Sequence, residues 1–136
     1  MKNEELISLA LEARKKSYSP YSGFRVGAAL LCGNGKVFCG CNIENSAFSP
    51  TCCAERTAFF KAISEGETDF EKIAIVGGKG DSEPEDFCAP CGVCRQVMNE
   101  FCGDDFFVIL AKSESEYKEY SLGEILPFSF GKSDVK

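Results

Sequence analysis

The chain has 136 residues, of which 44% are hydrophobic and 26% are charged, and its formal net charge is −6. This length suits one hydrophobic core, so we expect a single domain over residues 1–136. The acidic balance argues against a nucleic-acid partner, because proteins that bind phosphate backbones usually carry a basic surface. No apolar run approaches the roughly 20 residues that cross a bilayer, and the polar start Met1–Glu5 is unlike a signal peptide. We therefore expect a cytoplasmic protein with no membrane partner.

The spacing of apolar residues predicts helices that alternate with strands along the chain. The first predicted helix is amphipathic and ends before the turn-forming run Ser19–Gly23. Thr51 is the expected amino-terminal cap of the second helix, and Gly66 is its expected stop. Pro90 fits the first turn of the third helix. The expected helices are residues 3–16, 52–65 and 91–101, with a last helical turn over 121–126.

Runs rich in apolar and β-branched residues predict four strands and a short fifth one. Gly33-Asn34-Gly35 separates the first two strands, which is typical of a β-hairpin. Helices that alternate with strands favour a sheet covered on both faces with some parallel pairing, and the hairpin makes that sheet mixed. The fold class is therefore α/β. The expected strands are residues 25–32, 36–43, 72–77, 106–111 and 117–121.

Nine cysteines and no histidine are the most unusual feature of the composition. An odd number of cysteines without a secretion signal argues against a disulfide framework and favours a reducing compartment. Without histidine, a zinc site must use thiolates completed by carboxylates or water, and a Ser-His-Asp or Cys-His catalytic pair is excluded. Four cysteines are expected to pack as small apolar side chains, namely Cys32, Cys39, Cys41 and Cys102.

Two short motifs carry the candidate chemistry: Cys53-Ala54-Glu55 and Pro90-Cys91-Gly92-Val93-Cys94. Each lies at the start of a predicted helix, and such starts favour thiolates and can meet at one edge of an α/β sheet. The two cysteines of the second motif are three residues apart, so their sulfurs can face one side of a helical turn. Three thiolates leave one tetrahedral zinc position open to water, which is the mark of a catalytic site. Glu55 is then close enough to exchange a proton with that water without binding the metal.

The two motifs together are more specific than either one alone. Cys-x-Glu followed by Pro-Cys-x-x-Cys matches the zinc-deaminase signature, in which the glutamate is the general acid and base. Three other interpretations stay open: a closed four-cysteine site that includes Cys88, a zinc-stabilised binding module in which Glu55 has no role, and a thiol redox protein that uses Cys91 and Cys94. Pro90 argues against the closed site, because proline disfavours helix in the residue before it.

Beyond these motifs, the chain closely resembles the small homotetrameric cytidine deaminases over about residues 17–130. The resemblance implies a three-layer α/β/α sandwich around a five-stranded mixed sheet, and a homotetramer with shared active sites. It also implies hydrolysis of cytidine and deoxycytidine to uridine, deoxyuridine and ammonia, in pyrimidine salvage. The shared motifs are Pro20-Tyr21-Ser22, Phe24, Val26-Gly27-Ala28-Ala29-Leu30, Gly40-Cys41-Asn42-Ile43-Glu44-Asn45, Cys53-Ala54-Glu55-Arg56-Thr57-Ala58, Pro90-Cys91-Gly92-Val93-Cys94-Arg95-Gln96 and Leu126-Pro127-Phe128-Ser129-Phe130.

The resemblance implies roles in metal binding and catalysis for five residues. Cys53, Cys91 and Cys94 match the family's zinc ligands, and Glu55 matches its general acid and base. Arg56 matches a residue that hydrogen-bonds a ligand sulfur, which would offset the negative charge of three thiolates on one zinc ion. On the sequence alone, a position on the helix surface is equally open for this arginine.

The resemblance also implies roles in substrate binding. Asn42 and Glu44 match the pair that holds the ribose hydroxyls, and their side chains offer the donors and acceptors that hydroxyls need. Phe24 matches an aromatic wall of the nucleoside pocket, the backbone of Ala54 matches a contact to the pyrimidine edge, and Phe130 matches an aromatic that reaches the base in a neighbouring subunit. On residue type alone, the pair would be polar loop residues and the phenylalanines would be core residues.

The expected substrate is a small neutral nucleoside, although related folds deaminate polynucleotides, nucleotides or nucleoside antibiotics. The negative charge and the lack of an aromatic and basic tract weaken a polynucleotide substrate. The pair Asn42 and Glu44 favours a substrate with ribose over a free base. Phe48 stands where the family often has tyrosine, so a hydroxyl contact near the subunit junction is expected to be missing.

Overall fold

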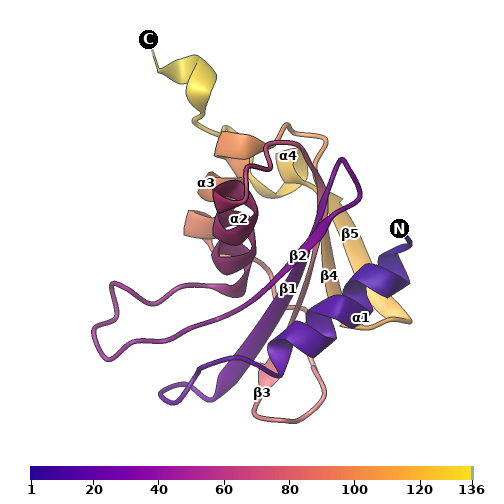
Figure 1. Ribbon diagram of the computed structural model, residues 1–136, viewed down its shortest axis with the longest axis vertical. Helices are drawn as coiled ribbons and strands as arrows, with labels where there is room; N and C mark the ends of the chain where they lie inside the picture. Colours follow the sequence, from indigo (N-terminus) through magenta and orange to yellow (C-terminus); the bar gives the residue numbers. More distant parts are fainter. Residues whose placement is uncertain (136) are drawn as a thin grey trace.

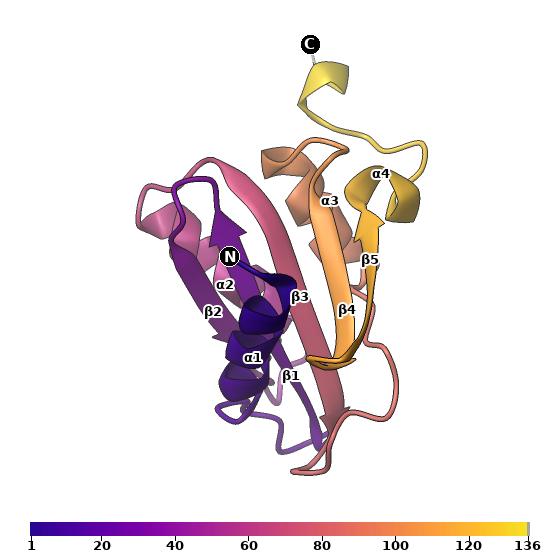
Figure 2. The ribbon, with the colours of Figure 1, turned by 90° about the vertical axis from the view of Figure 1, so that its right-hand side faces the viewer.

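A computed structural model describes residues 1–135 and contains a five-stranded sheet with helices on both faces (Figures 1 and 2). The helices are α1 (Asn3–Arg14), α2 (Ala54–Ser64), α3 (Gly92–Phe101), α4 (Leu122–Ile125) and the 3-10 helix η1 (Lys132–Asp134). The strands are β1 (Phe24–Cys32), β2 (Val37–Cys41), β3 (Phe70–Lys79), β4 (Phe107–Ser113) and β5 (Glu116–Ser121). Among residues 1–135, no helix has both the length and the apolar character that a bilayer span requires.

The sheet is mixed, with the strand order β2-β1-β3-β4-β5. The β1–β2 hairpin turns at Gly35, whose positive φ of 90° suits a residue without a side chain. β1 also pairs antiparallel with β3, whereas β3 and β4 pair in parallel and are joined by a crossover that contains α3. β5 completes the sheet as an antiparallel neighbour of β4.

Alternate residues of the central strands supply two cores, one on each face of the sheet. On the face covered by α1, the helix residues Leu6, Ile7 and Ala10 pack against the sheet. On the face covered by α2 and α3, Phe59 and Met98 are fully buried. Figure 1 shows α1 on one side of the sheet and α2 with α3 on the other. The three-layer α/β/α arrangement expected from the sequence is therefore confirmed.

Gly40 allows β2 to approach the first turn of α2 very closely. A Cβ atom at this position would lie 2.6 Å from the Ala54 carbonyl oxygen and 2.6 Å from the Ala58 nitrogen. The strand therefore contacts the helix backbone directly, without a side chain between them. This contact fixes the height of α2 above the sheet at the end of the helix that carries Cys53 and Glu55.

Two sequence-based details of the helix starts are wrong. Thr51 does not cap α2, because its hydroxyl accepts a hydrogen bond from the Asn45 nitrogen and the cap position is held by Cys53. Pro90 lies just before the cap residue of α3, Cys91, rather than in its first turn. The predicted stop at Gly66 agrees with the structure, where this glycine follows α2 with a φ of 93°.

Candidate metal centre

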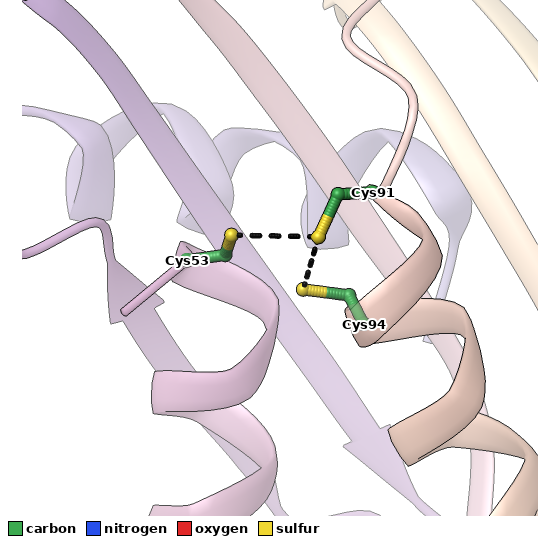
Figure 3. A group of neighbouring side chains, drawn as sticks. All are labelled: Cys53, Cys91 and Cys94. Carbon is green, nitrogen blue, oxygen red and sulfur yellow. Dashed lines mark hydrogen bonds between the residues drawn. The ribbon is translucent and has the colours of Figure 1, made fainter. Parts of the chain in front are cut away.

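Three cysteine sulfurs meet where the amino ends of α2 and α3 lie side by side (Figure 3). Cys53 is the cap residue of α2, Cys91 is the cap residue of α3, and Cys94 lies in the first turn of α3. The Sγ atoms of Cys53 and Cys91 are 3.7 Å apart, and those of Cys91 and Cys94 are 3.5 Å apart. All three sulfurs lie within 4.8 Å of one another. The structure thus brings together the three cysteines that the two motifs single out.

Two sides of the sulfur triangle have the length expected at a zinc site. A tetrahedral zinc ion with bonds of about 2.3 Å to sulfur separates its sulfur ligands by about 3.8 Å. The two spacings of 3.7 and 3.5 Å match that value and are far longer than a disulfide bond of about 2.05 Å. Two helix amino termini add partial positive charge beside the thiolates. The donor set, three sulfurs with one tetrahedral position left over, fits a catalytic zinc ion.

Electrostatics favour negative charge on this cluster. The pKa of Cys53 is lowered to about 5, first because Cys94 hydrogen-bonds its sulfur and then because Arg56 and Cys91 do so as well. The pKa of Cys94 is raised, first by the same hydrogen bond to Cys53 and then by burial. These hydrogen bonds favour the thiolate form of Cys53. Zinc binding would release the protons of the remaining thiols, because cysteine binds zinc as a thiolate.

Arg56 lies beside the cluster rather than on the outer surface of α2. Its Nη2 donates a hydrogen bond to the Cys53 sulfur over 3.4 Å. This hydrogen bond is the largest cause of the raised pKa of the guanidinium. Its Nε atom is buried and has no hydrogen-bond partner among the described residues. The charge of Arg56 is therefore directed toward the sulfurs, where it opposes the excess negative charge of three thiolates.

Glu55 is a buried carboxyl group in the first turn of α2, two residues after Cys53. Only 4% of its surface is exposed. Burial raises the pKa of Glu55 to about 7, and the nearby Cys53 thiolate acts in the same direction. A carboxyl group that titrates near neutral pH can both accept and return a proton, which is what a general acid and base requires.

The other cysteines lie outside the sulfur triangle. Cys88 packs against the core on the α2 face and contacts Gly77, and it is not part of the group that could hold a metal. The closed four-cysteine site is therefore not formed. Cys52 instead accepts a hydrogen bond from the Thr57 hydroxyl over 3.7 Å. The cysteines expected to be structural are also absent from the group, and Cys32 is fully buried in the same core.

Asn42 follows β2 and is held by β1 and the preceding loop. Its Nδ2 donates to the Phe24 carbonyl over 2.8 Å, and its Oδ1 accepts from the Val26 nitrogen over 2.9 Å. The Ser17 hydroxyl also donates to Oδ1. The amide oxygen therefore has both acceptor positions occupied, and one hydrogen of Nδ2 is left for a ligand.

Glu44 is exposed, yet three hydrogen bonds fix its carboxylate. The Tyr21 and Ser22 nitrogens donate to Oε1 over 3.0 and 3.1 Å, and the Ser22 hydroxyl donates to Oε2 over 2.5 Å. The hydroxyl bond is the largest cause of the lowered pKa of Glu44. Ser22 lies in one of the shared motifs, but its contact with Glu44 was not predicted, and Ser17 lies in none of those motifs, because a contact across more than 20 residues leaves no local pattern.

The remaining predicted site residues lie in three different settings. Phe24 starts β1, is 40% exposed, and lines a cavity of about 430 Å³ together with Gly77 and Cys88. Ala54 is fully buried at the start of α2. Phe130 is 61% exposed in the segment after α4, which extends away from the sheet (Figure 2). The structure thus groups Phe24 with the loop that leads to the sulfur triangle, and leaves Phe130 facing outward.

Comparisons with known proteins agree with the chemistry of this centre. The family model for the cytidine and deoxycytidylate deaminase zinc-binding region matches residues 1–110. A cytidine deaminase from Sporosarcina psychrophila is 46% identical over 132 residues, which cover 97% of this chain and 93% of that protein. A cytidine deaminase from Halalkalibacterium halodurans is 45% identical over 135 residues, which cover 99% of this chain and 98% of that protein. The crystal structure of cytidine deaminase from Burkholderia pseudomallei superposes with a TM-score of 0.87 at 44% identity, over 96% of this chain and 100% of that one.

Proposed function

Because this chain belongs to the family of cytidine and deoxycytidylate deaminases, we propose that it is a zinc-dependent enzyme that hydrolyses cytidine and deoxycytidine to uridine and deoxyuridine with release of ammonia. One observation carries the proposal: a triangle of three cysteine sulfurs with a buried carboxyl group two residues from one of them. A purely structural zinc site has no need of such a carboxyl group, and usually has a fourth protein ligand.

Cys53, Cys91 and Cys94 hold the zinc ion in this account. Bound zinc supplies a Lewis acid that brings the pKa of a water molecule close to neutral. Arg56 donates to the Cys53 sulfur and so reduces the electron density that three thiolates would otherwise give to the metal. The guanidinium would thereby preserve the Lewis acidity of zinc, and with it the low pKa of the water molecule on which the reaction depends.

Glu55 moves the protons of the reaction. It accepts a proton from the attacking water and delivers a proton to ring nitrogen N3 as the water oxygen bonds to carbon C4. It then transfers the second proton of that oxygen to the exocyclic amine, and the bond between C4 and this nitrogen breaks to release ammonia. Water and cytidine are consumed, and uridine and ammonia are formed. The raised pKa of about 7 supports both directions of transfer at neutral pH.

The free hydrogen-bonding positions of Asn42 and Glu44 support a substrate with a sugar. Asn42 has one donor hydrogen left on Nδ2. A carboxylate has about four acceptor positions, and three hydrogen bonds already reach Glu44, which leaves about one. One donor and one acceptor match the needs of a single hydroxyl group. These positions favour a substrate with sugar hydroxyl groups over a free base.

The charge near Phe24 supports a neutral nucleoside rather than a nucleotide. The cavity that Phe24 lines is also lined by Glu83, Glu85 and Asp86, with Lys79 as the only basic side chain among the described residues there. A phosphate group in this cavity would meet three carboxylate groups and one ammonium group, an excess of like charge. The same argument disfavours a deoxycytidylate substrate, although the family name includes it.

We further propose a single-domain subunit that assembles into a homotetramer in the cytoplasm. Several aromatic side chains are exposed, among them Tyr21, Phe48, Phe128 and Phe130. Exposed aromatic surface of this kind is typical of protein interfaces. In such an assembly Phe130 reaches the nucleoside site of a neighbouring subunit. Light scattering of the purified protein tests the assembly: a mass of four chains supports it, and a monomer that deaminates cytidine at full rate contradicts shared sites.

The enzymatic proposal is tested by mixing the purified protein with cytidine and following the ultraviolet change as cytosine becomes uracil. A parallel sample is treated with a zinc chelator and then given zinc again. The account predicts conversion that stops with the chelator and returns with the metal. Folded, zinc-loaded protein that leaves cytidine and deoxycytidine unchanged would overturn it.

A further inference from the structure

We propose that the hydroxyl group of Ser22 is a positioning group for nucleoside binding, which holds the Glu44 carboxylate and the Phe24 backbone in one arrangement. The inference rests on the proposed function, because it requires Glu44 to contact the sugar of the substrate. It adds a residue that touches neither the metal cluster nor the reacting atoms. Ser22 acts through Glu44 and is therefore not a catalytic residue.

The turn that contains Ser22 surrounds one end of Glu44. The backbone N–H groups of Tyr21 and Ser22 both donate to Oε1, over 3.0 and 3.1 Å. Consecutive N–H groups that point at one oxygen form an anion-binding nest. This nest anchors only one of the two carboxylate oxygens. The other oxygen, Oε2, has the Ser22 hydroxyl as its hydrogen-bond donor, over 2.5 Å.

The direction of the Ser22 hydroxyl hydrogen follows from its second contact. The Phe24 nitrogen donates to the Ser22 Oγ atom over 3.0 Å, so an acceptor position of that oxygen is already in use. A hydroxyl has a single hydrogen, and the ionised carboxylate is the acceptor that lies within reach. The hydrogen therefore points at Oε2 of Glu44. One side chain thus connects the proposed sugar contact with the proposed aromatic wall.

The turn itself is fixed to the rest of the fold. The Gly23 nitrogen donates to the Ser19 carbonyl over 2.9 Å, and the Gly80 nitrogen donates to the Gly23 carbonyl over 2.7 Å. Gly23 has a φ of 69°, which a residue without a side chain adopts readily. Ser22 is therefore held from both sides and can orient Glu44 at little additional cost in entropy.

Removing this hydroxyl releases Oε2 while the nest still holds Oε1. The Glu44 carboxylate can then rotate, and the acceptor position meant for the sugar is no longer pre-oriented. Ser22 is exposed, so water replaces part of the lost interaction. We expect the Ser22→Ala variant to raise KM for cytidine about tenfold, the effect of losing one hydrogen bond to a charged group at an exposed position. The turnover number should change by less than about twofold, because Glu55 and the three cysteines are untouched.

The experiment measures kcat and KM of the intact zinc-loaded enzyme for cytidine and for 2′,3′-dideoxycytidine, which lacks both ring hydroxyls. Ser22→Thr keeps a hydroxyl group and should restore a near wild-type KM. Ser19→Ala is the matched control, because Ser19 lies in the same turn and, among residues 1–135, its hydroxyl forms a hydrogen bond only with Ser17. A Glu44→Gln variant with and without Ser22→Ala completes the set.

The proposal predicts a loss that depends on the sugar. Ser22→Ala should raise KM for cytidine about tenfold and leave kcat and KM for 2′,3′-dideoxycytidine nearly unchanged. In a protein that already carries Glu44→Gln, adding Ser22→Ala should not raise KM for cytidine further. An equal rise in KM for both nucleosides, or an unchanged KM for cytidine, would overturn the role of Ser22. If the wild-type enzyme does not deaminate cytidine at all, the proposed function fails instead, and the two failures are thereby distinguished.

Discussion

The contact between Gly40 and the first turn of α2 predicts that a single added methyl group will disturb the metal centre. In Gly40→Ala, the new Cβ atom would lie 2.6 Å from the Ala54 oxygen and 3.0 Å from the Thr57 Cβ atom. An ordinary contact between carbon and a carbonyl oxygen is about 3.3 Å. The helix must therefore move away from the sheet by roughly 0.7 Å. Neither partner is a flexible side-chain end that could turn aside.

This displacement has two measurable consequences. Forced overpacking in a well-packed region costs about 1–3 kcal/mol, and we expect the free energy of unfolding to fall by that amount. Cys53 and Glu55 move with α2, whereas Cys91 and Cys94 stay on α3. Since a misplacement of 1 Å costs about a hundredfold in rate, we expect kcat/KM for cytidine to fall between about tenfold and a hundredfold.

Urea unfolding of purified Gly40→Ala tests the predicted decrease in the free energy of unfolding, and steady-state kinetics test the predicted decrease in kcat/KM. Gly103→Ala serves as the control, because the new Cβ atom would meet only the end of the Asp105 side chain, which can move. The control should keep its activity and lose less than about 0.5 kcal/mol. A Gly40→Ala protein with unchanged activity and stability would refute the reasoning that β2 sets the position of α2.

Other substitutions test the core and the metal ligands. Phe59 is fully buried and packs against Phe70 and Phe106, with ring centroids 5.1 and 6.0 Å away. Phe59→Ala should lower the free energy of unfolding in urea by about 3–5 kcal/mol. A decrease below about 1 kcal/mol would contradict this packing. Cys94→Ser should reduce bound zinc, measured by atomic absorption, well below one ion per chain, whereas Cys102→Ser should keep one ion, because Cys102 lies outside the sulfur triangle. Unchanged zinc content and affinity in the Cys94 variant would remove that cysteine from the ligand set.

The fold could be predicted from the sequence wherever local patterns decide the structure. Apolar spacing located all three long helices and all five strands, with ends that differ by a few residues. The hairpin was evident from Gly33-Asn34-Gly35, because few residues adopt the required backbone angles. The cap of α2 was missed because Thr51 has a competing partner in Asn45, and no local rule reveals such a contact. Strand order depends on contacts between distant residues, so the sequence patterns did not predict it; the family resemblance implied only that five strands form a mixed sheet.

The site could be predicted in part for a similar reason. Motif spacing identified the three cysteines, because ligands at two helix starts leave a short and unusual signature. The sequence left the position of Arg56 open, and the structure resolves it by placing the guanidinium against the Cys53 sulfur. The hydrogen bonds from Ser17 to Asn42 and from Ser22 to Glu44 could not be predicted, although Ser22 lies in a shared motif, since the partners are 25 and 22 residues apart. The assignment of Asn42, Glu44, Phe24, Ala54 and Phe130 to substrate binding remains a prediction.

The central claim, that Glu55 moves the protons of a zinc-dependent deamination, is tested most directly with Glu55→Gln. The substitution keeps the size of the side chain but replaces the carboxyl group with an amide, which cannot accept and return a proton near neutral pH. The account predicts a protein that folds, binds one zinc ion per chain and binds cytidine, but whose kcat is lower by about a hundredfold to ten-thousandfold. A zinc-loaded Glu55→Gln protein with near wild-type turnover of cytidine would contradict it.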